Sequence, residues 1–131
     1  MNFLKIKETC LYVTDLAQAK TFYADVLELP MISYLEGKHL FFKAGASVLL
    51  LFNPEDSKHK VSPPAHYGGG KQHFAFEVED NDYEKAKDWI KSKGIEITEE
   101  VTWQSGKKSF YFEDPAGNVL EIVPQNAIWP E

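Results

Sequence analysis

The order of predicted elements repeats within the chain, and this duplication constrains the fold more than any other feature. Three pairs of segments align in the same order, and they begin at Glu8 and His73, at Lys38 and Lys108, and at Val48 and Val119. Each copy reads as a strand, a helix and three further strands, with a spacing of about 65–71 residues between copies. We therefore expect an α+β protein built from two βαβββ modules.

The first copy shows the alternation and helical spacing that this order requires. Asp15 is a helix cap, and Gln18 stands three residues later at the partner position of a capping box. Apolar residues then recur at helical spacing from Leu16 to Leu27, and Pro30 closes the helix. The expected strands cover residues 5–13, 31–36, 39–43 and 47–52.

The second copy follows a long connector. Residues 53–71 contain three prolines and the run Gly68-Gly69-Gly70, which is typical of a linker or a functional lid. A helix capped within residues 80–82 is expected to end at Gly94. The expected strands cover residues 72–78, 95–103, 108–113 and 119–124. We expect one domain, residues 1–131, with module one at 1–53, a connector at 54–71 and module two at 72–131.

The charge pattern narrows the range of partners. The net charge is −6, and the 14 basic residues are scattered. A nucleic-acid groove or an anionic membrane surface is therefore not expected as a partner.

The longest apolar run, residues 48–52, is too short to span a bilayer. The single cysteine, Cys10, favours a buried thiol in a cytoplasmic protein. No arginine is present, so an anionic substrate must be held by lysine, backbone amides or a metal.

Three segments resemble the glyoxalase/bleomycin resistance/extradiol dioxygenase superfamily, also called the vicinal oxygen chelate superfamily. They are residues 11–27, the strand His73-Phe74-Ala75-Phe76-Glu77-Val78, and the run from Phe112 to Ile122 that contains Asp-Pro-Ala-Gly-Asn. The resemblance implies an incomplete β-barrel with a concave cleft inside and helices outside. It also implies a small-molecule substrate and a homodimer.

The resemblance also implies a metal site, because the family places ligands on the first and last strand of each module. The equivalent positions are Glu8, Leu50, His73 and Glu121. Leucine cannot coordinate, so the expected ligands are Glu8, His73 and Glu121, holding iron, zinc, nickel, manganese or cobalt. The residues support Glu121 independently, since a carboxylate in an apolar strand is costly unless it is paired or metal-bound.

Further site residues follow from strand parity and from the connector. Glu121 and Tyr111 are candidate catalytic residues, as a base and a hydrogen-bond donor. The candidate substrate-pocket residues are His39, Leu50, Phe52, His66 and Trp103. The site residues also have structural interpretations. His73 could be a core histidine, Glu8 a solvated edge-strand residue and His66 a surface-loop residue. The aromatic candidates could simply pack in the core.

Two functional hypotheses remain open at this point. The first is a metal-dependent lyase, isomerase or dioxygenase acting on a small molecule with vicinal oxygens. The alternative is a metal-free binding protein of the bleomycin-resistance type, which Leu50, the acidic charge and the aromatics favour. A weaker third hypothesis is a domain whose cleft is vestigial, and fold analogy cannot choose between these.

Overall fold

The computed structural model describes residues 1–130 and divides into two compact units, Met1–Gly70 and the part that begins at Lys71. The first unit therefore includes nearly the whole connector. Within residues 1–130, no helix has the length and apolar character needed to cross a membrane.

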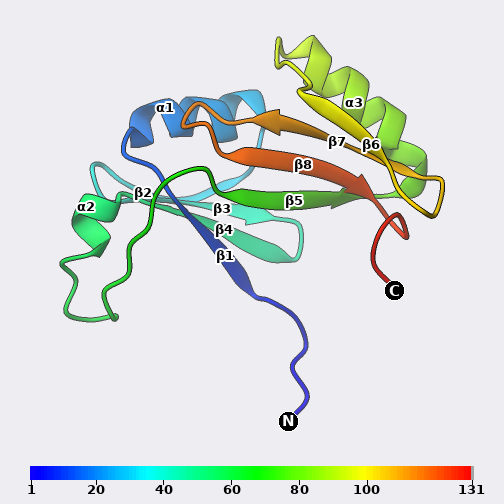
Figure 1. Cartoon of the computed structure of the whole chain (residues 1–131). Coiled ribbons are helices and arrows are strands. Elements are labelled where there is room, and N and C mark those ends of the chain that lie inside the picture. Colours follow the sequence, from blue (N-terminus) through cyan, green and yellow to red (C-terminus); the bar gives the residue numbers. More distant parts are fainter. Residues whose placement is uncertain (131) are drawn as a thin grey trace. The chain divides into compact units, whose positions relative to one another are not determined.

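The first unit is an open four-stranded sheet with short helices (Figure 1). Its elements are β1 (Glu8–Tyr12), α1 (Leu16–Lys20), η1 (Thr21–Val26), β2 (Met31–Leu35), β3 (His39–Ala44), β4 (Ser47–Phe52) and α2 (Pro54–Ser57). The strand order is β1-β4-β3-β2, with β1 and β4 parallel and the other neighbours antiparallel.

The second unit repeats this topology. Its elements are β5 (His73–Val78), η2 (Asp80–Asp82), α3 (Tyr83–Ser92), β6 (Glu99–Thr102), β7 (Lys108–Glu113) and β8 (Val119–Pro124), in the order β5-β8-β7-β6. The registers also agree, since Glu8 pairs with Val48 as His73 pairs with Val119. The duplication and the α+β class of two βαβββ modules are thus confirmed, and neither sheet closes into a barrel.

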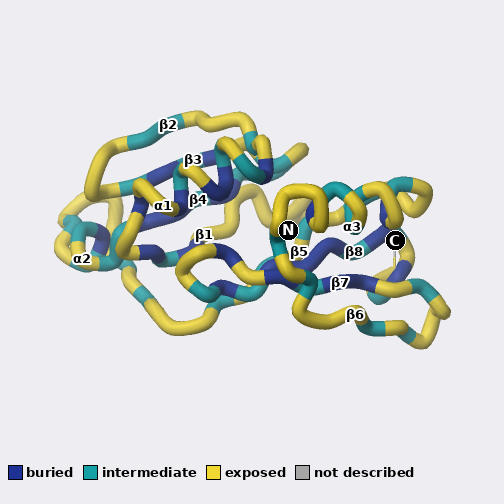
Figure 2. The backbone as a smooth tube through the Cα atoms, turned by 90° about the horizontal axis from the view of Figure 1, so that it is seen from above, coloured by how far each residue is buried: buried dark blue, intermediate teal, exposed yellow. Residues whose placement is uncertain are grey.

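Each unit buries one face of its sheet beneath its helix. In unit one the buried residues of the central strands are Leu40, Phe42, Leu49 and Leu51, and in unit two they are Phe110, Phe112, Leu120 and Ile122. Figure 2 shows this burial along the central strands of each unit, while β2 and β6 at the sheet edges are largely exposed. Because side chains alternate along a strand, the residues between these positions face away from the helices.

Local signals explain how the first helix begins. The Asp15 carboxylate accepts a hydrogen bond from the backbone N–H of Gln18 at 3.0 Å, which is the expected cap. The helix is not regular to its end, however, because α1 passes into the π-helix η1 at Thr21. The Leu27 N–H bonds to the Phe22 carbonyl, a five-residue step that the apolar spacing did not reveal.

Three other expectations need correction. The strand expected over 95–103 is confined to Glu99–Thr102. The connector contains the short helix α2, capped by Asn53, whose side chain accepts from the Glu55 N–H at 3.1 Å. Cys10 is exposed rather than buried, because it lies on the face of β1 that points away from the helices.

Candidate functional site

The two residues predicted as ligands in the second unit lie side by side. Nε2 of His73 is 3.4 Å from Oε1 of Glu121, which is only 4% exposed. Oε2 of Glu121 is also buried and accepts no hydrogen bond within residues 1–130. A buried carboxylate oxygen without a hydrogen bond is costly, so this atom is suited to a ligand that the protein alone does not supply.

The orientation of His73 is fixed by its backbone neighbour on β8. Nδ1 of the imidazole lies 2.9 Å from the carbonyl oxygen of Val119, which can only accept a hydrogen bond. Nδ1 therefore carries the proton, and in the neutral ring Nε2 presents its lone pair beside Glu121. A histidine whose second nitrogen donates to a carbonyl is the usual arrangement of a metal ligand.

The turn before β8 holds this pair in register. The Asp114 carboxylate accepts from the backbone N–H groups of Ala116 and Asn118, at 3.0 and 2.8 Å. The buried Asn118 side chain in turn accepts from the Gln72 N–H at 3.0 Å, immediately before His73. The Asp-Pro-Ala-Gly-Asn motif therefore fixes the start of β5 against β8, which explains its value as a sequence signal.

Tyr111 is the third side chain at this place. It pairs with Glu121 across β7 and β8, and its ring centroid lies 6.1 Å from that of His73. Burial raises the pKa of Tyr111, the Ser109 hydrogen bond opposes this, and the Glu121 carboxylate raises it further. Tyr111 therefore keeps its proton at neutral pH and is a hydrogen-bond donor.

Glu8 belongs to the other unit. It is exposed on β1, an edge strand, and its position in the first sheet is equivalent to that of His73 in the second. Neither unit by itself gathers three His, Cys, Asp or Glu side chains that could hold a metal ion, within residues 1–130. The ligand set Glu8, His73 and Glu121 stays a prediction, of which the second unit supplies an adjacent pair.

The helix-free face of the first sheet carries a cavity of about 560 Å³. Four of the five predicted pocket residues and Glu8 line it. The full lining is Glu8, Cys10, Tyr12, His39, Phe41, Leu50, Phe52, Lys60, Pro63 and His66. Alternation along the expected strand 5–13 puts Glu8, Cys10 and Tyr12 on one face, but it indicated no role for Tyr12 or Lys60, because the path of the connector was not predictable.

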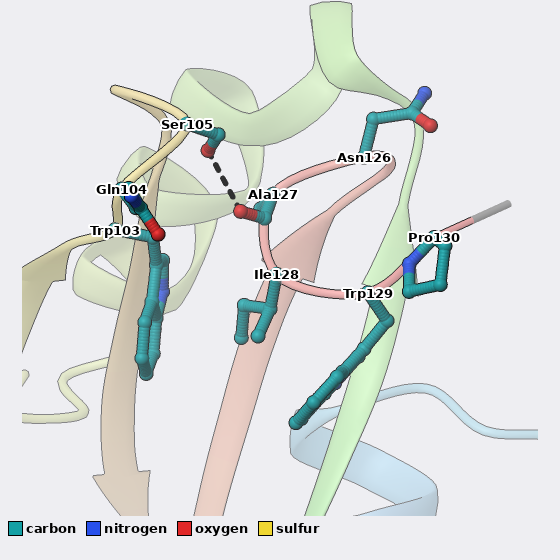
Figure 3. Close-up of a pocket in the computed structure, with 8 residues that line it drawn as sticks. All are labelled: Trp103, Gln104, Ser105, Asn126, Ala127, Ile128, Trp129 and Pro130. Atoms are coloured by element: carbon teal, nitrogen blue, oxygen red, sulfur yellow. Dashed lines mark hydrogen bonds between the residues drawn. The ribbon is translucent and has the colours of Figure 1, made fainter.

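Trp103, the fifth predicted pocket residue, lies in the second unit and lines a different hollow. This hollow, of about 670 Å³, lies between residues 103–105 and 126–130. Figure 3 shows the Trp103 and Trp129 rings flanking Ile128, with Ser105 Oγ donating to the Ala127 carbonyl at 2.7 Å. The indole N–H of Trp103 donates a hydrogen bond to the Ser109 hydroxyl at 2.9 Å, which fixes the orientation of the ring.

Comparison with known proteins agrees with this geometry. A family model described as the Glyoxalase/Bleomycin resistance protein/Dioxygenase superfamily matches residues 5–122. The chain belongs to this superfamily. The match covers both modules and includes all three predicted ligand positions, so the resemblance inferred from the sequence motifs is confirmed.

Several members of the glyoxalase superfamily are similar over most of the chain. Metallothiol transferase FosB of Staphylococcus haemolyticus is 31% identical over 111 residues, 84% of this chain and 76% of that protein. FosB of Staphylococcus saprophyticus is 28% identical over 111 residues, 84% of this chain and 70% of that protein. A crystal structure of lactoylglutathione lyase from Agrobacterium tumefaciens matches with a TM-score of 0.89 and 35% identity, covering 95% of this chain and 96% of that one.

Proposed function

We propose that the protein is a divalent-metal-dependent enzyme acting on a small molecule with vicinal oxygens. The observation that carries this proposal is the pair of His73 and the buried Glu121, with one imidazole nitrogen oriented by Val119 and one carboxylate oxygen without a hydrogen bond. The similar proteins support it, since the name metallothiol transferase denotes a metal-dependent enzyme.

The donor chemistry of these residues fits a divalent ion. His73 and Glu121 would hold it together with Glu8, and nitrogen and carboxylate donors suit iron, zinc, nickel, manganese or cobalt. Such an ion would act as a Lewis acid on two neighbouring substrate oxygens. The Tyr111 O–H would donate to a substrate oxygen, and a glutamate would serve as the base.

The reaction class follows less directly. The names metallothiol transferase and lactoylglutathione lyase both describe reactions of thiol compounds. They favour transferase or lyase chemistry over dioxygenase chemistry. Leu50, in the sheet position equivalent to Glu121, departs from a four-ligand site, so a ligand set of three protein side chains is proposed.

A metal-free binding protein is the second candidate. The observation that favours it is the cavity of the first sheet, where Leu50 and three aromatic side chains form much of the lining. A mostly apolar cavity with few polar groups is typical of small-molecule sites. In this case the cavity would bind a flat ligand without catalysing a reaction of it.

Metal analysis separates the two candidates. The purified protein is incubated with each of the five ions, desalted and analysed for bound metal, alongside Glu121→Gln and His73→Gln. Glu96→Gln, an exposed loop change, is the matched control. We expect stoichiometric metal in the wild type and the control, and loss in both site variants. If the wild type retains none of the ions, the enzyme proposal fails and the binding protein is favoured.

Assembly and location are part of the proposal. We expect a homodimer in the cytoplasm, with a single free thiol at Cys10. Light scattering of the purified protein tests the dimer, and a monomeric mass at all concentrations contradicts it.

A further inference from the structure

The connector forms one wall of the cavity in the first unit. The Tyr12 hydroxyl lies 2.7 Å from Nδ1 of His66, and the His66 ring packs edge-on against Phe52 at 4.5 Å between centroids. The backbone N–H of His66 also donates a hydrogen bond to the Ser57 carbonyl at 3.3 Å. The connector is thus held to the sheet by side-chain contacts of His66 and to α2 by a backbone hydrogen bond, and it gives the cavity a defined end.

The two ends of the cavity differ in charge. Glu8 and Tyr12 lie on one face of β1, about 13 Å apart at roughly 3.3 Å per residue. The Glu8 end carries a carboxylate, while Lys60 lines the cavity with His66. The Lys60 ammonium lies 5.8 Å from the Phe52 ring centroid and takes part in none of the ion pairs found within residues 1–130. A half-buried ammonium without a carboxylate partner attracts an anion.

The hydrogen bond between the Tyr12 hydroxyl and His66 bears on what the imidazole offers to a ligand. Burial, followed by the neighbouring Cys10, raises the pKa of Tyr12 to about 12, so its hydroxyl keeps its proton. Where the Tyr12 hydroxyl donates to Nδ1 of His66, the imidazole carries its own proton on Nε2 and can donate it to a ligand. Burial and Lys60 lower the pKa of His39 although the Asp56 carboxylate opposes them, so His39 stays neutral at pH 7. Lys60 is accordingly the fixed positive charge of the lining.

The wall between the two ends is aromatic. His39 stacks on Phe41 with 3.9 Å between centroids and 10° between planes. Phe41 meets Phe52 edge-to-face at 5.4 Å, and Phe52 meets His66 in the same way. Such an array offers ring faces and edges to a flat ligand.

We propose that this cavity binds an aromatic carboxylate, with its carboxylate at Lys60 and His66 and its ring against Phe41 and Phe52. The inference rests on the proposed function, because Glu8, one of the proposed metal ligands, lines the same cavity, and the part of the molecule beyond the ring extends toward Glu8. Lysine takes the place of the arginine that the sequence lacks.

The test uses two probes of the same shape and different charge, 4-fluorophenylacetate and 4-fluorophenylacetamide. Binding to the metal-free protein is measured by fluorine NMR. The variants are Lys60→Met and Lys60→Arg. The matched control is Lys58→Met, which removes a connector lysine that pairs with Glu55 and does not line the cavity.

We expect the carboxylate to bind the wild type and Lys58→Met roughly tenfold more tightly than the amide, as for a charge-assisted contact. Lys60→Met should abolish this preference for the carboxylate, whereas Lys60→Arg, which keeps the positive charge, should retain most of it. The inference is overturned if neither probe binds the wild type up to its solubility. Equal binding of both probes, or an unchanged preference in Lys60→Met, also overturns it.

The outcome is separable from that of the proposed function. Probe binding is measured without metal, and metal retention depends on His73 and Glu121 in the other unit. If the protein retains metal but Lys60→Met does not change probe binding, only the proposal of an aromatic carboxylate ligand is contradicted. If probe binding depends on Lys60 but the protein retains no metal, only the proposal of a metal-dependent enzyme is contradicted. Thermal unfolding of each variant confirms that a lost preference is not lost structure.

Discussion

His73 Nε2 and Glu121 Oε1 lie 3.4 Å apart across neighbouring parallel strands, and the second oxygen of the carboxylate is buried without a hydrogen bond. That oxygen is therefore unsatisfied in the protein alone. The hydrogen bond to Val119 uses one nitrogen of the imidazole, and the other nitrogen faces Glu121. This arrangement has opposite consequences for stability with and without a metal.

Glu121→Gln should stabilise the metal-free protein or leave it unchanged. The substitution removes a buried charge, one oxygen of which lacks a hydrogen bond at a cost of about 1–3 kcal/mol, and the amide keeps the shape of the side chain. In the wild type, a metal at a hundred times its dissociation constant should add about 2.7 kcal/mol, and the variant should lack this gain. Urea unfolding with and without the ion measures both effects. A variant that is destabilised without metal and still gains from it contradicts the ligand role of Glu121.

Asn118→Ala should destabilise the second unit by about 1–3 kcal/mol. The buried side chain joins the Asp114 carboxylate to the Gln72 N–H, so its removal takes one hydrogen bond from each of these groups and leaves a space in the buried turn. Because Gln72 precedes His73, metal affinity should also fall. Chemical unfolding and metal titration measure the two effects, with the exposed Asn81→Ala as control. Equal stabilities of the two variants would show that the turn does not hold β5.

The repeat could be predicted from sequence because alternation, turns and strand order all agree in both copies. Leu40 and Phe42 recur as Phe110 and Phe112, and the core uses them equivalently. The π-helix η1 could not be predicted, since a five-residue hydrogen-bond step leaves no distinct apolar pattern. The helix α2 did have a signal, Asn53 followed by Pro54 and acidic residues, but the prolines of the connector concealed it.

Part of the candidate site could be predicted from the sequence, because alternation along the repeated strands determines which face a side chain occupies. Parity along β5 and β8 places His73 and Glu121 on the face away from the helix, and their contact follows from pairing of parallel strands. Lys60 and the Tyr12–His66 contact depend on the path of an irregular connector. No periodicity determines such a path, so the roles of Lys60 and Tyr12 emerged only from the structure, whereas His66 was already a candidate pocket residue.

Tyr12 should make the folded protein sensitive to high pH. Its pKa is raised to about 12, largely by burial, whereas an unfolded tyrosine titrates near 10. The folded state keeps the proton where the unfolded chain has lost it, so this contribution is complete below about pH 10 and declines as the pH rises toward about 12. Urea unfolding across this range measures the slope. Tyr12→Phe should flatten it relative to Tyr67→Phe, an exposed control, and equal slopes would contradict the assignment.

Gly68→Ala should loosen the connector from the first sheet. A Cβ at Gly68 would lie 2.9 Å from Cδ2 of Tyr12, closer than carbon atoms approach, so the ring must move. The ring cannot shift freely because its hydroxyl bonds to His66. Overpacking of this kind costs about 1–3 kcal/mol. Gly69→Ala is a matched control, since nothing lies within 4 Å of the added carbon, and it should be neutral or slightly stabilising.

Two measurements follow these glycine variants. Thermal unfolding should show a lower midpoint for Gly68→Ala alone, and limited proteolysis should cut its connector faster than that of the wild type or Gly69→Ala. The Lys60-dependent preference for 4-fluorophenylacetate should fall in the same variant, because His66 and Lys60 both reach the cavity from the connector. If Gly68→Ala and Gly69→Ala behave alike in all three assays, the Tyr12–His66 contact does not hold the connector against the sheet.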